Sequence, residues 1–301
     1  LVLYRDLSVR GPSDVSGDIV RLDVTTPEGI GVVDGLSLPD GSPVPSVTGC
    51  EVGDNNHGDV SFYDCHIAGF PDNGLYADPP EGSINVFGGF FRNNGVAGVR
   101  ITTSEPSLVR GVRVRCDDAD GAGENMRGIR LRGGYDHVVE DCVVELLDVT
   151  SSDGAVTIAS ELASATVRNC HLHVDADGVN AIRVKSPNAD ATDAVRAGPF
   201  RFENVRITGD AVGGAAVQAA DRRGCTFSNL QIHQSGADRD GIVTTNVEGE
   251  LLDTCISVTN DALSLRNSQI ERRNVRVGDD PETERCGTDR PPADGTPTPP
   301  E

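Results

Sequence analysis

The sequence predicts an all-β fold, a parallel β-helix of about ten to eleven coils, because two short patterns alternate along the chain. The first pattern runs apolar, any residue, then Asn, Asp or Gly, then apolar, any and apolar, as in residues 139–144. The second runs small residue, apolar, any and apolar, as in residues 181–184. One such repeat cannot bury its apolar face alone, whereas stacked repeats share a continuous core.

The first pattern recurs at a nearly constant interval. The apolar residue after the turn residue is Leu7 in the first copy and Val275 in the last, which gives a mean spacing of about 27 residues over ten intervals. The turn residues are Asp6, Gly35, Asp64, Gly89, Gly111, Asp141, Asn169, Asn204, Asn229, Thr254 and Asn274. Ten of these eleven are Gly, Asn or Asp, the residues that tolerate positive φ. Each coil is therefore predicted to bend at one left-handed residue between two strands.

The repeat predicts one β-helix domain over residues 1–277, followed by a flexible acidic tail over residues 278–301. The tail is rich in Asp, Pro and Thr, and such a composition cannot bury a core. The chain begins at Leu1, already inside a repeat. We therefore expect an N-terminal cap or an export signal to precede it in a longer or processed protein.

The pattern resembles the right-handed parallel β-helix repeat of the pectin-lyase-like superfamily, from about Leu1 to Val277. The Asn or Asp turn followed by apolar, any and apolar carries this resemblance. It implies a right-handed, single-stranded β-helix in an extracellular or cell-surface protein. The superfamily includes polysaccharide lyases, glycoside hydrolases, viral tail proteins and adhesins, so the resemblance does not select an activity.

The composition is strongly acidic, with a formal net charge of −21, and Lys185 is the only lysine. This Asp-rich, nearly lysine-free composition resembles that of proteins from extreme halophiles. The alternative is a solubilising acidic surface in a mesophile with a GC-rich genome. Phosphate contacts need basic stripes, so nucleic-acid binding is not expected. Membrane insertion is not expected either, because the chain contains no run of 18 apolar residues.

Four cysteines follow the turn residue directly and are predicted to point inward: Cys65, Cys142, Cys170 and Cys255. Buried cysteine behaves as a small apolar residue, which predicts a ladder of free thiols. The alternative is a disulfide between Cys142 and Cys170, since consecutive coils bring their Cα atoms within bridging range. Spacings typical of zinc sites are absent.

The outward residue of the second pattern suggests a binding face. Along the stack it reads Arg21 and then, after a coil in which the pattern is ambiguous, Tyr76, Arg100, Arg130, Thr157, Arg183, Gln218, Thr244 and Ser264. Arginine binds carboxylate or sulfate through a two-pronged fork. We therefore predict a groove for an acidic polysaccharide, with the substrate-binding residues Tyr76, Arg100, Arg130, Arg132, Arg183 and Lys185. The alternative is a solvated stripe in which each cation pairs with a neighbouring Asp or Glu.

A calcium site is a second hypothesis for the same side of the molecule. In pectate-lyase-like enzymes calcium lies beside the groove and an arginine acts as base. The resemblance would put the ligands at Asp153, Asp175 and Asp177 and the base at Arg183. Calcium requires six to eight oxygen ligands, and the alternative is ordinary turn chemistry of Asp.

The histidines do not predict a metal site, because the pairs that share a coil position are distant from one another. His66 and His171 are four coils apart, and His173 and His233 are two coils apart, if the predicted register holds. The chain has no Trp and four Tyr, whereas platforms for neutral sugars are usually aromatic. An anionic ligand, or none, is therefore favoured.

Two functions remain open at this point. The first is an extracellular β-helix that binds an acidic polysaccharide and, if it is an enzyme, cleaves it as a lyase rather than as a glycoside hydrolase. The second is a non-enzymatic surface, adhesin or virion-fibre module, for which an oligomer is expected. The clustered arginines favour the first function, and the missing lyase and hydrolase signatures favour the second.

Overall fold

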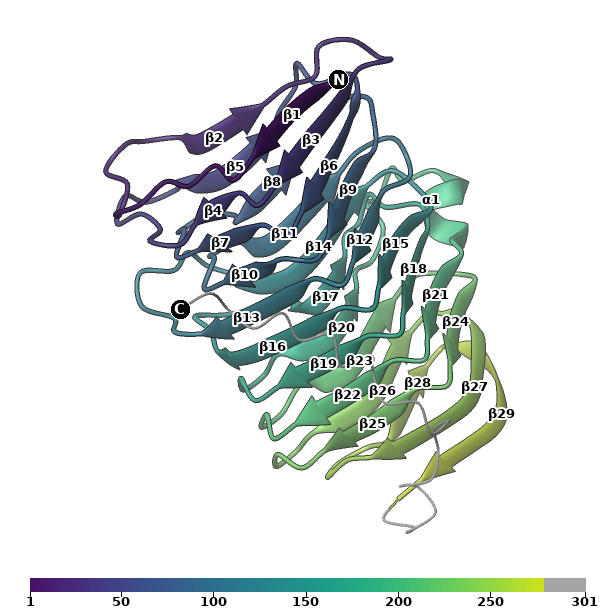
Figure 1. Cartoon of the computed structure of the whole chain (residues 1–301). Helices are drawn as coiled ribbons and strands as arrows, with labels where there is room; N and C mark the ends of the chain where they lie inside the picture. The colour runs from purple at the N-terminus through teal and green to yellow at the C-terminus, as the bar shows by residue number, and fades with distance from the viewer. Residues whose placement is uncertain (279–301) are drawn as a thin grey trace.

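The computed structural model describes residues 1–278 and confirms a parallel β-solenoid of about ten turns (Figure 1). Strands of successive turns pair in parallel, as in β14 with β17. The predicted tail from residue 279 onward lies outside the described residues. Within residues 1–278, no helix is long and apolar enough to cross a membrane.

Each turn contributes strands to three faces. The second pattern forms a ten-stranded sheet: β2 (Asp18–Leu22), β5 (Thr48–Val52), β8 (Leu75–Ala77), β11 (Ala97–Thr102), β14 (Arg127–Gly133), β17 (Gly154–Ile158), β20 (Asn180–Val184), β23 (Ala215–Ala220), β26 (Asp240–Thr245) and β28 (Leu263–Arg266). The first pattern forms the other two faces, which meet at the bends and belong to one nineteen-stranded sheet.

Before the bend, that sheet contains β1 (Val2–Arg5), β3 (Ile30–Asp34), β6 (Asp59–Tyr63), β9 (Ile84–Phe87), β12 (Leu108–Arg110), β15 (His137–Glu140), β18 (Ala165–Arg168), β21 (Phe200–Glu203) and β24 (Cys225–Ser228). After the bend it contains β4 (Ser37–Leu38), β7 (His66–Ala68), β10 (Phe90–Arg92), β13 (Arg113–Asp117), β16 (Val143–Asp148), β19 (His171–Val174), β22 (Arg206–Gly209) and β25 (Gln231–Gln234). The long strands β27 (Glu248–Ser257) and β29 (Gln269–Val277) run across both faces, and the short helix α1 (Asp193–Ala197) lies in the longest insertion.

Ten of the eleven predicted turn residues have positive φ, which confirms the bends at those ten positions. Asn169 and Asn204 have φ of 55° and 54°, and the residues after them, Cys170 and Val205, are buried. The exception is Thr254. Asp253 takes the left-handed conformation there, with φ 47°, because a β-branched residue strongly disfavours it.

This exception corrects the predicted register of the tenth copy. Thr254 is fully buried and pairs with Val275, so Thr254 occupies the inward position that was predicted for Cys255. Cys255 pairs instead with Gln231 on β25. Its register therefore differs from the prediction, although Cys255 is buried, with 4 % exposed.

The asparagines at the bends form a hydrogen-bonded ladder along the stack. The side-chain amide of Asn204 donates to Oδ1 of Asn169 at 2.8 Å, and that of Asn229 donates to Oδ1 of Asn204 at 2.9 Å. Asn169 donates in turn to Asp141 at 3.2 Å. The same residue type thus supplies both the left-handed bend and a contact between turns.

Replacing Asn169 with valine is expected to lower the free energy of unfolding by about 1–2 kcal/mol, because a β-branched residue is strained at positive φ. Urea unfolding measures the change. Asn169→Gly is the matched control, since glycine accepts the bend and loses only the ladder contact. An Asn169→Val protein as stable as the unchanged one would contradict this account of the bend.

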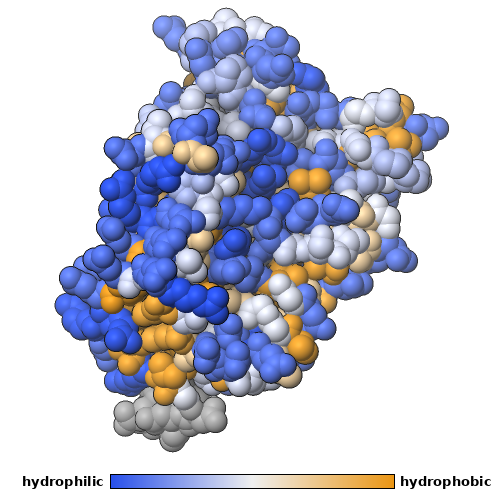
Figure 2. Space-filling view, turned by 180° about the vertical axis from the view of Figure 1, so that it is seen from behind, coloured by the Kyte–Doolittle hydropathy of each residue, from blue (hydrophilic) through white to orange (hydrophobic). Residues whose placement is uncertain are grey.

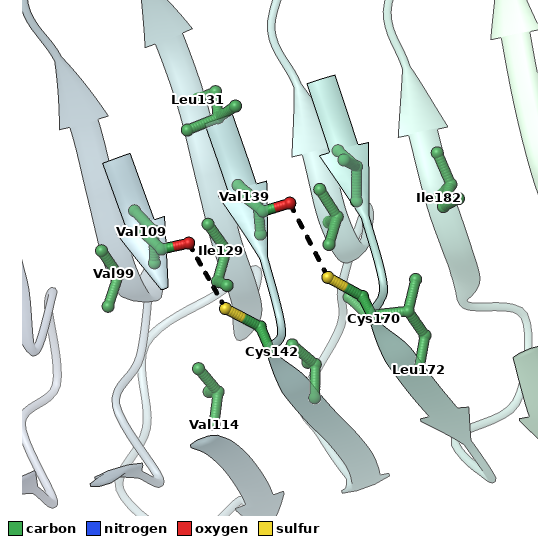
Figure 3. Close-up of a cluster of buried hydrophobic side chains, with 14 of the residues drawn as sticks. Val99, Val109, Val114, Ile129, Leu131, Val139, Cys142, Cys170, Leu172 and Ile182 are labelled. Carbon is green, nitrogen blue, oxygen red and sulfur yellow. Dashed lines mark hydrogen bonds between the residues drawn. The ribbon is translucent and has the colours of Figure 1, made fainter. Parts of the chain in front are cut away.

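The core contains the predicted buried thiols. Cys65, Cys142 and Cys170 are free and almost fully buried, and Cys50, Cys116 and Cys225 are also free and buried. The thiols of Cys142 and Cys170 lie near the backbone carbonyls of Val109 and Val139, at 3.6 and 3.8 Å (Figure 3). The alternative disulfide between these two cysteines is therefore not formed. Cys255 departs from the prediction, because it is disulfide-bonded.

Candidate functional site

The ten-stranded sheet brings the predicted arginines into one column. Arg100 lies opposite Arg130, Arg130 opposite Thr157, and Thr157 opposite Arg183. Tyr76 precedes Arg100 in the same register. We call Arg100, Arg130 and Arg183 the cationic column. The predicted spacing, with Thr157 between the last two arginines, is therefore correct.

Two other positions of the outward series need comment. Glu51 occupies the coil between Arg21 and Tyr76 that the sequence left unassigned. In β26 the outward residue is Val243, which pairs with Gln218 and Ser264. Thr244 was predicted to point outward but is fully buried. It can point inward because its hydroxyl is hydrogen-bonded to Ser268 at 2.9 Å.

No arginine of the cationic column forms an ion pair with a carboxylate of residues 1–278. The guanidinium of Arg100 stacks on the ring of Tyr76, 4.2 Å from its centroid. The Nε atoms of Arg100 and Arg130 and the hydroxyl of Thr157 are buried and lack a hydrogen-bond partner within the described chain. Most buried polar groups are hydrogen-bonded, so an uncompensated row of donors is unusual and suits an anionic ligand.

The electrostatic environment of the column is also unfavourable without an anion. Burial, together with the positive charges of Arg127, Arg100 and Arg132, lowers the pKa of Arg130 to about 10. Burial also lowers the pKa of Arg100 and of Arg183. Arg130 remains charged at neutral pH, because a pKa of about 10 lies far above it. A bound carboxylate or sulfate would reduce the mutual repulsion.

The cations beside the column are already paired. Asp153 Oδ2 accepts a hydrogen bond from Arg127 Nε at 2.7 Å and lies 2.7 Å from Lys185 Nζ. Arg132 lies 3.6 Å from Glu161. The solvated-stripe alternative thus describes Arg132 and Lys185, two of the predicted substrate-binding residues. It does not describe the cationic column itself.

A groove of about 670 Å³ lies beside Arg130. Its lining includes Pro43, Asp72 and the segment 121–125, which belong to loops that lead into the ten-stranded sheet. Arg127 and Arg130 contribute to the lining. Figure 2 shows the side of the molecule turned away in Figure 1, which is mainly hydrophilic, with apolar side chains gathered towards the C-terminal end. The groove offers a polar ligand both cations and a carboxyl group, because Arg127, Arg130 and Asp72 line it.

Two carboxyl groups with a raised pKa adjoin the column at its N-terminal end. Burial and the neighbouring Asp18 raise the pKa of Glu51 to about 7. Burial likewise raises the pKa of Asp72. A carboxyl with a pKa near 7, such as that of Glu51, can donate a proton at neutral pH. The sequence did not point to Glu51, because the second pattern is ambiguous in that coil.

The structure does not assemble the predicted calcium ligands. Asp153 is engaged by two cations, and although burial opposes ionisation, Lys185 and Arg127 hold the pKa of Asp153 below its usual value. Asp175 contacts His173, and Asp177 accepts a hydrogen bond from the backbone of Val212 at 2.8 Å. Within residues 1–278 no group of three or more His, Cys, Asp or Glu side chains is arranged to hold a metal ion. Calcium binding stays a prediction that these contacts do not support.

Two buried arginines were not foreseen as special residues. Arg222 and Arg239 are fully buried, and neither has a carboxylate partner among the described residues. Arg239 donates to the carbonyls of Val179 and Gly213 at 2.7 and 2.6 Å. Arg239 also donates to the side chain of Gln234 at 2.9 Å, and Arg222 lies over the ring of Phe200. Since these partners are buried groups of the solenoid itself, we assign both arginines to its stability rather than to ligand binding.

No family model, curated protein or solved structure matches the chain. The fold and the site define it as a parallel β-solenoid with an unpaired cationic column on one sheet. Because one fold carries many functions, the function has to be argued from this column.

Proposed function

We propose that the chain is a right-handed β-helix protein of the pectin-lyase-like type that binds an acidic polysaccharide along its ten-stranded sheet, outside the cell or on its surface. The observation that carries the proposal is the cationic column, three arginines without carboxylate partners among residues 1–278, in a chain of net charge −21. Unpaired, partly buried cations in so acidic a protein are costly unless an anion binds them.

The length of the column supports a polymeric ligand. Neighbouring strands lie about 4.8 Å apart, so Arg100 and Arg183, three strands apart, are separated by about 14 Å. A single carboxylate or phosphate cannot contact both ends. A chain of linked anionic sugars can meet the arginines in series, with Thr157 as a further hydrogen-bonding group between two of them.

Cleavage is a further part of the proposal. In a lyase, a base removes the proton from the carbon next to the carboxylate. Arg183 is the candidate for this base, because burial lowers its pKa. Hydrolysis requires two carboxyls at a defined separation, and the sequence contains no hydrolase signature. We therefore favour a lyase, if the protein is an enzyme.

Arg183→Ala is expected to weaken binding of an acidic oligosaccharide about tenfold or more, since each charge-assisted contact contributes about 1.5–3 kcal/mol. Calorimetry with uronate and sulfated oligosaccharides, at molar salt and with and without calcium, measures the change. Arg132→Ala is the matched control, because Arg132 already pairs with Glu161; we expect a small change. Neutral glycans should not bind.

Turnover on the same ligands separates binding from cleavage. Arg183→Lys should retain part of the binding and lose lyase activity, because lysine differs from arginine in geometry and pKa. Saturable binding without any turnover would show that the protein binds the polysaccharide but does not cleave it. The absence of saturable binding to every acidic glycan would refute the whole proposal.

The second candidate is a non-enzymatic surface or fibre module, which the missing lyase and hydrolase signatures of the sequence favour. Such a module is expected to form oligomers. Sedimentation velocity distinguishes the candidates: a concentration-dependent oligomer, together with the absence of binding to every acidic glycan, would favour the module.

A further inference from the structure

Two histidines on one strand point towards the same atom. His171 and His173 are two residues apart on β19, so their side chains project from the same face of the nineteen-stranded sheet. His171 Nε2 and His173 Nδ1 each lie 2.9 Å from the hydroxyl oxygen of Thr208 on β22. The sequence predicted no clustered histidines, and this pair corrects that expectation.

A carboxylate fixes the orientation of one ring. Asp175 Oδ2 lies 3.0 Å from His173 Nε2, and Asp175 Oδ1 accepts a hydrogen bond from the backbone N–H of Asp210 at 3.0 Å. A carboxylate at Nε2 places the ring proton there and leaves the lone pair of Nδ1 directed at Thr208. A histidine held in this way by a carboxylate is the usual arrangement around a metal ligand.

We propose that His171 and His173 form a binding site for a borderline transition-metal ion, Zn²⁺ or Cu²⁺, with Asp175 as the positioning residue of His173. Imidazole nitrogen is the ligand that these ions prefer among neutral side chains. The ion takes the place near Thr208 on which both nitrogens converge, and the Thr208 hydroxyl and water complete its coordination. His171 then carries its ring proton on Nδ1, so that both nitrogens facing the ion are unprotonated.

Both nitrogens lie at hydrogen-bond distance, 2.9 Å, from the Thr208 oxygen. A bound ion therefore replaces these two hydrogen bonds and draws both nitrogens to itself. Only two ligands are histidines, and within the described chain no third His, Cys, Asp or Glu joins them. The site is therefore open, with exchangeable water on the ion.

One charged neighbour of the pair is bound by other side chains, and another is a cation that opposes the binding of a metal ion. Glu145 pairs with His173 across the strands, but its carboxylate is bound by Arg113 and Arg115 at 2.8 and 3.2 Å. Arg206 neighbours His171 on β22. The pair belongs to a different sheet from the cationic column, so this inference does not depend on the proposed function.

Calorimetric titration of the tag-free, EDTA-treated protein with CuCl₂ and ZnCl₂ tests the site. We expect one saturable site, weakened at least tenfold by His171→Ala and by His173→Ala. Asp175→Asn should weaken it about 10–100-fold. The control is His66→Ala, because His66 occupies the same outward position on β7, four turns away. The metal affinity of this variant should equal that of the unchanged protein.

The Cu²⁺ electron paramagnetic resonance spectrum gives a second readout. Hyperfine splitting from imidazole nitrogen is expected in the unchanged protein and should be lost or reduced in either histidine variant. His171→Gln and His173→Gln, with melting temperatures measured beside them, keep the test valid if an alanine variant does not fold. Lack of saturable binding, or binding that survives in both histidine variants, would overturn the proposal.

Discussion

Replacing Arg222 with methionine is expected to lower the free energy of unfolding by about 3–5 kcal/mol. Arg222 is fully buried and has no carboxylate partner among the described residues. Its guanidinium donates instead to four backbone carbonyls, those of Ala159, Leu162, Lys185 and Val195. Methionine fills much of the same volume but donates no hydrogen bond, so these buried carbonyls would lose their donor.

The position of these carbonyls explains why the effect should be large. They belong to the connection after β17 and to the insertion after β20 that carries α1. The guanidinium also lies over the ring of Phe200, 4.8 Å from its centroid. Although burial lowers the pKa of Arg222 to about 10, the group stays charged at neutral pH. One side chain thus joins loops that are distant in sequence.

Arg223→Met is the matched control, because the neighbouring arginine is half-exposed and pairs only with the exposed Asp193 at 3.4 Å. Its stability should change by about 0.5 kcal/mol or less. Urea unfolding compares the two variants. Limited trypsin digestion should also show faster cleavage after Lys185 or Arg196 in Arg222→Met alone. Equal unfolding midpoints for both variants would contradict the assigned role.

The register of the fold could be predicted because two independent signals agree on it. Only a few residue types tolerate the left-handed bend, and the alternation of the strands then assigns every side chain to the inside or the outside. The prediction failed where those signals were ambiguous. Asp253 and Thr254 are both polar turn candidates, and the hydroxyl of Thr244 is hydrogen-bonded to the partly buried Ser268. At both places the predicted register of the strand was therefore wrong by one residue.

The candidate site could be predicted in its positions but not in its pairing. Alternation along the strands projects Arg100, Arg130 and Arg183 from one face. Whether a carboxylate neutralises them depends on the conformations of the connecting loops, as for Asp153, which turns towards Arg127. No pattern in the sequence encodes that choice.

The remaining functional groups were missed for related reasons. Thr208 joins His171 and His173 across the longest insertion, 37 and 35 residues away in sequence, so the regular repeat length does not align them. Arginine is almost never fully buried unless it is paired. Arg222 and Arg239 are exceptions because they donate to backbone carbonyls. Every residue has such a carbonyl, so the sequence does not show which of them need a donor.

The melting temperature is expected to fall when the salt concentration is lowered from about 1 M to about 0.01 M, because the screening length grows from about 3 Å to about 30 Å. The net charge is −21, and turns lie about 4.8 Å apart. Several carboxylates at strand ends and in loops accept hydrogen bonds from backbone N–H groups rather than pairing with cations, as Asp118, Asp148 and Asp177 do. Without screening, these charges repel one another from turn to turn.

A neutralised variant separates this repulsion from general salting-out. Asp118→Asn, Asp148→Asn and Asp177→Asn combined keep side chains that can accept the same backbone hydrogen bonds while removing three negative charges. Scanning calorimetry should show a smaller salt dependence for the triple variant, and sucrose should not replace salt in the unchanged protein. If the unchanged protein melts at the same or a higher temperature at low salt, its acidic surface is not adapted to high salt. The halophile-like composition would then reflect solubility alone.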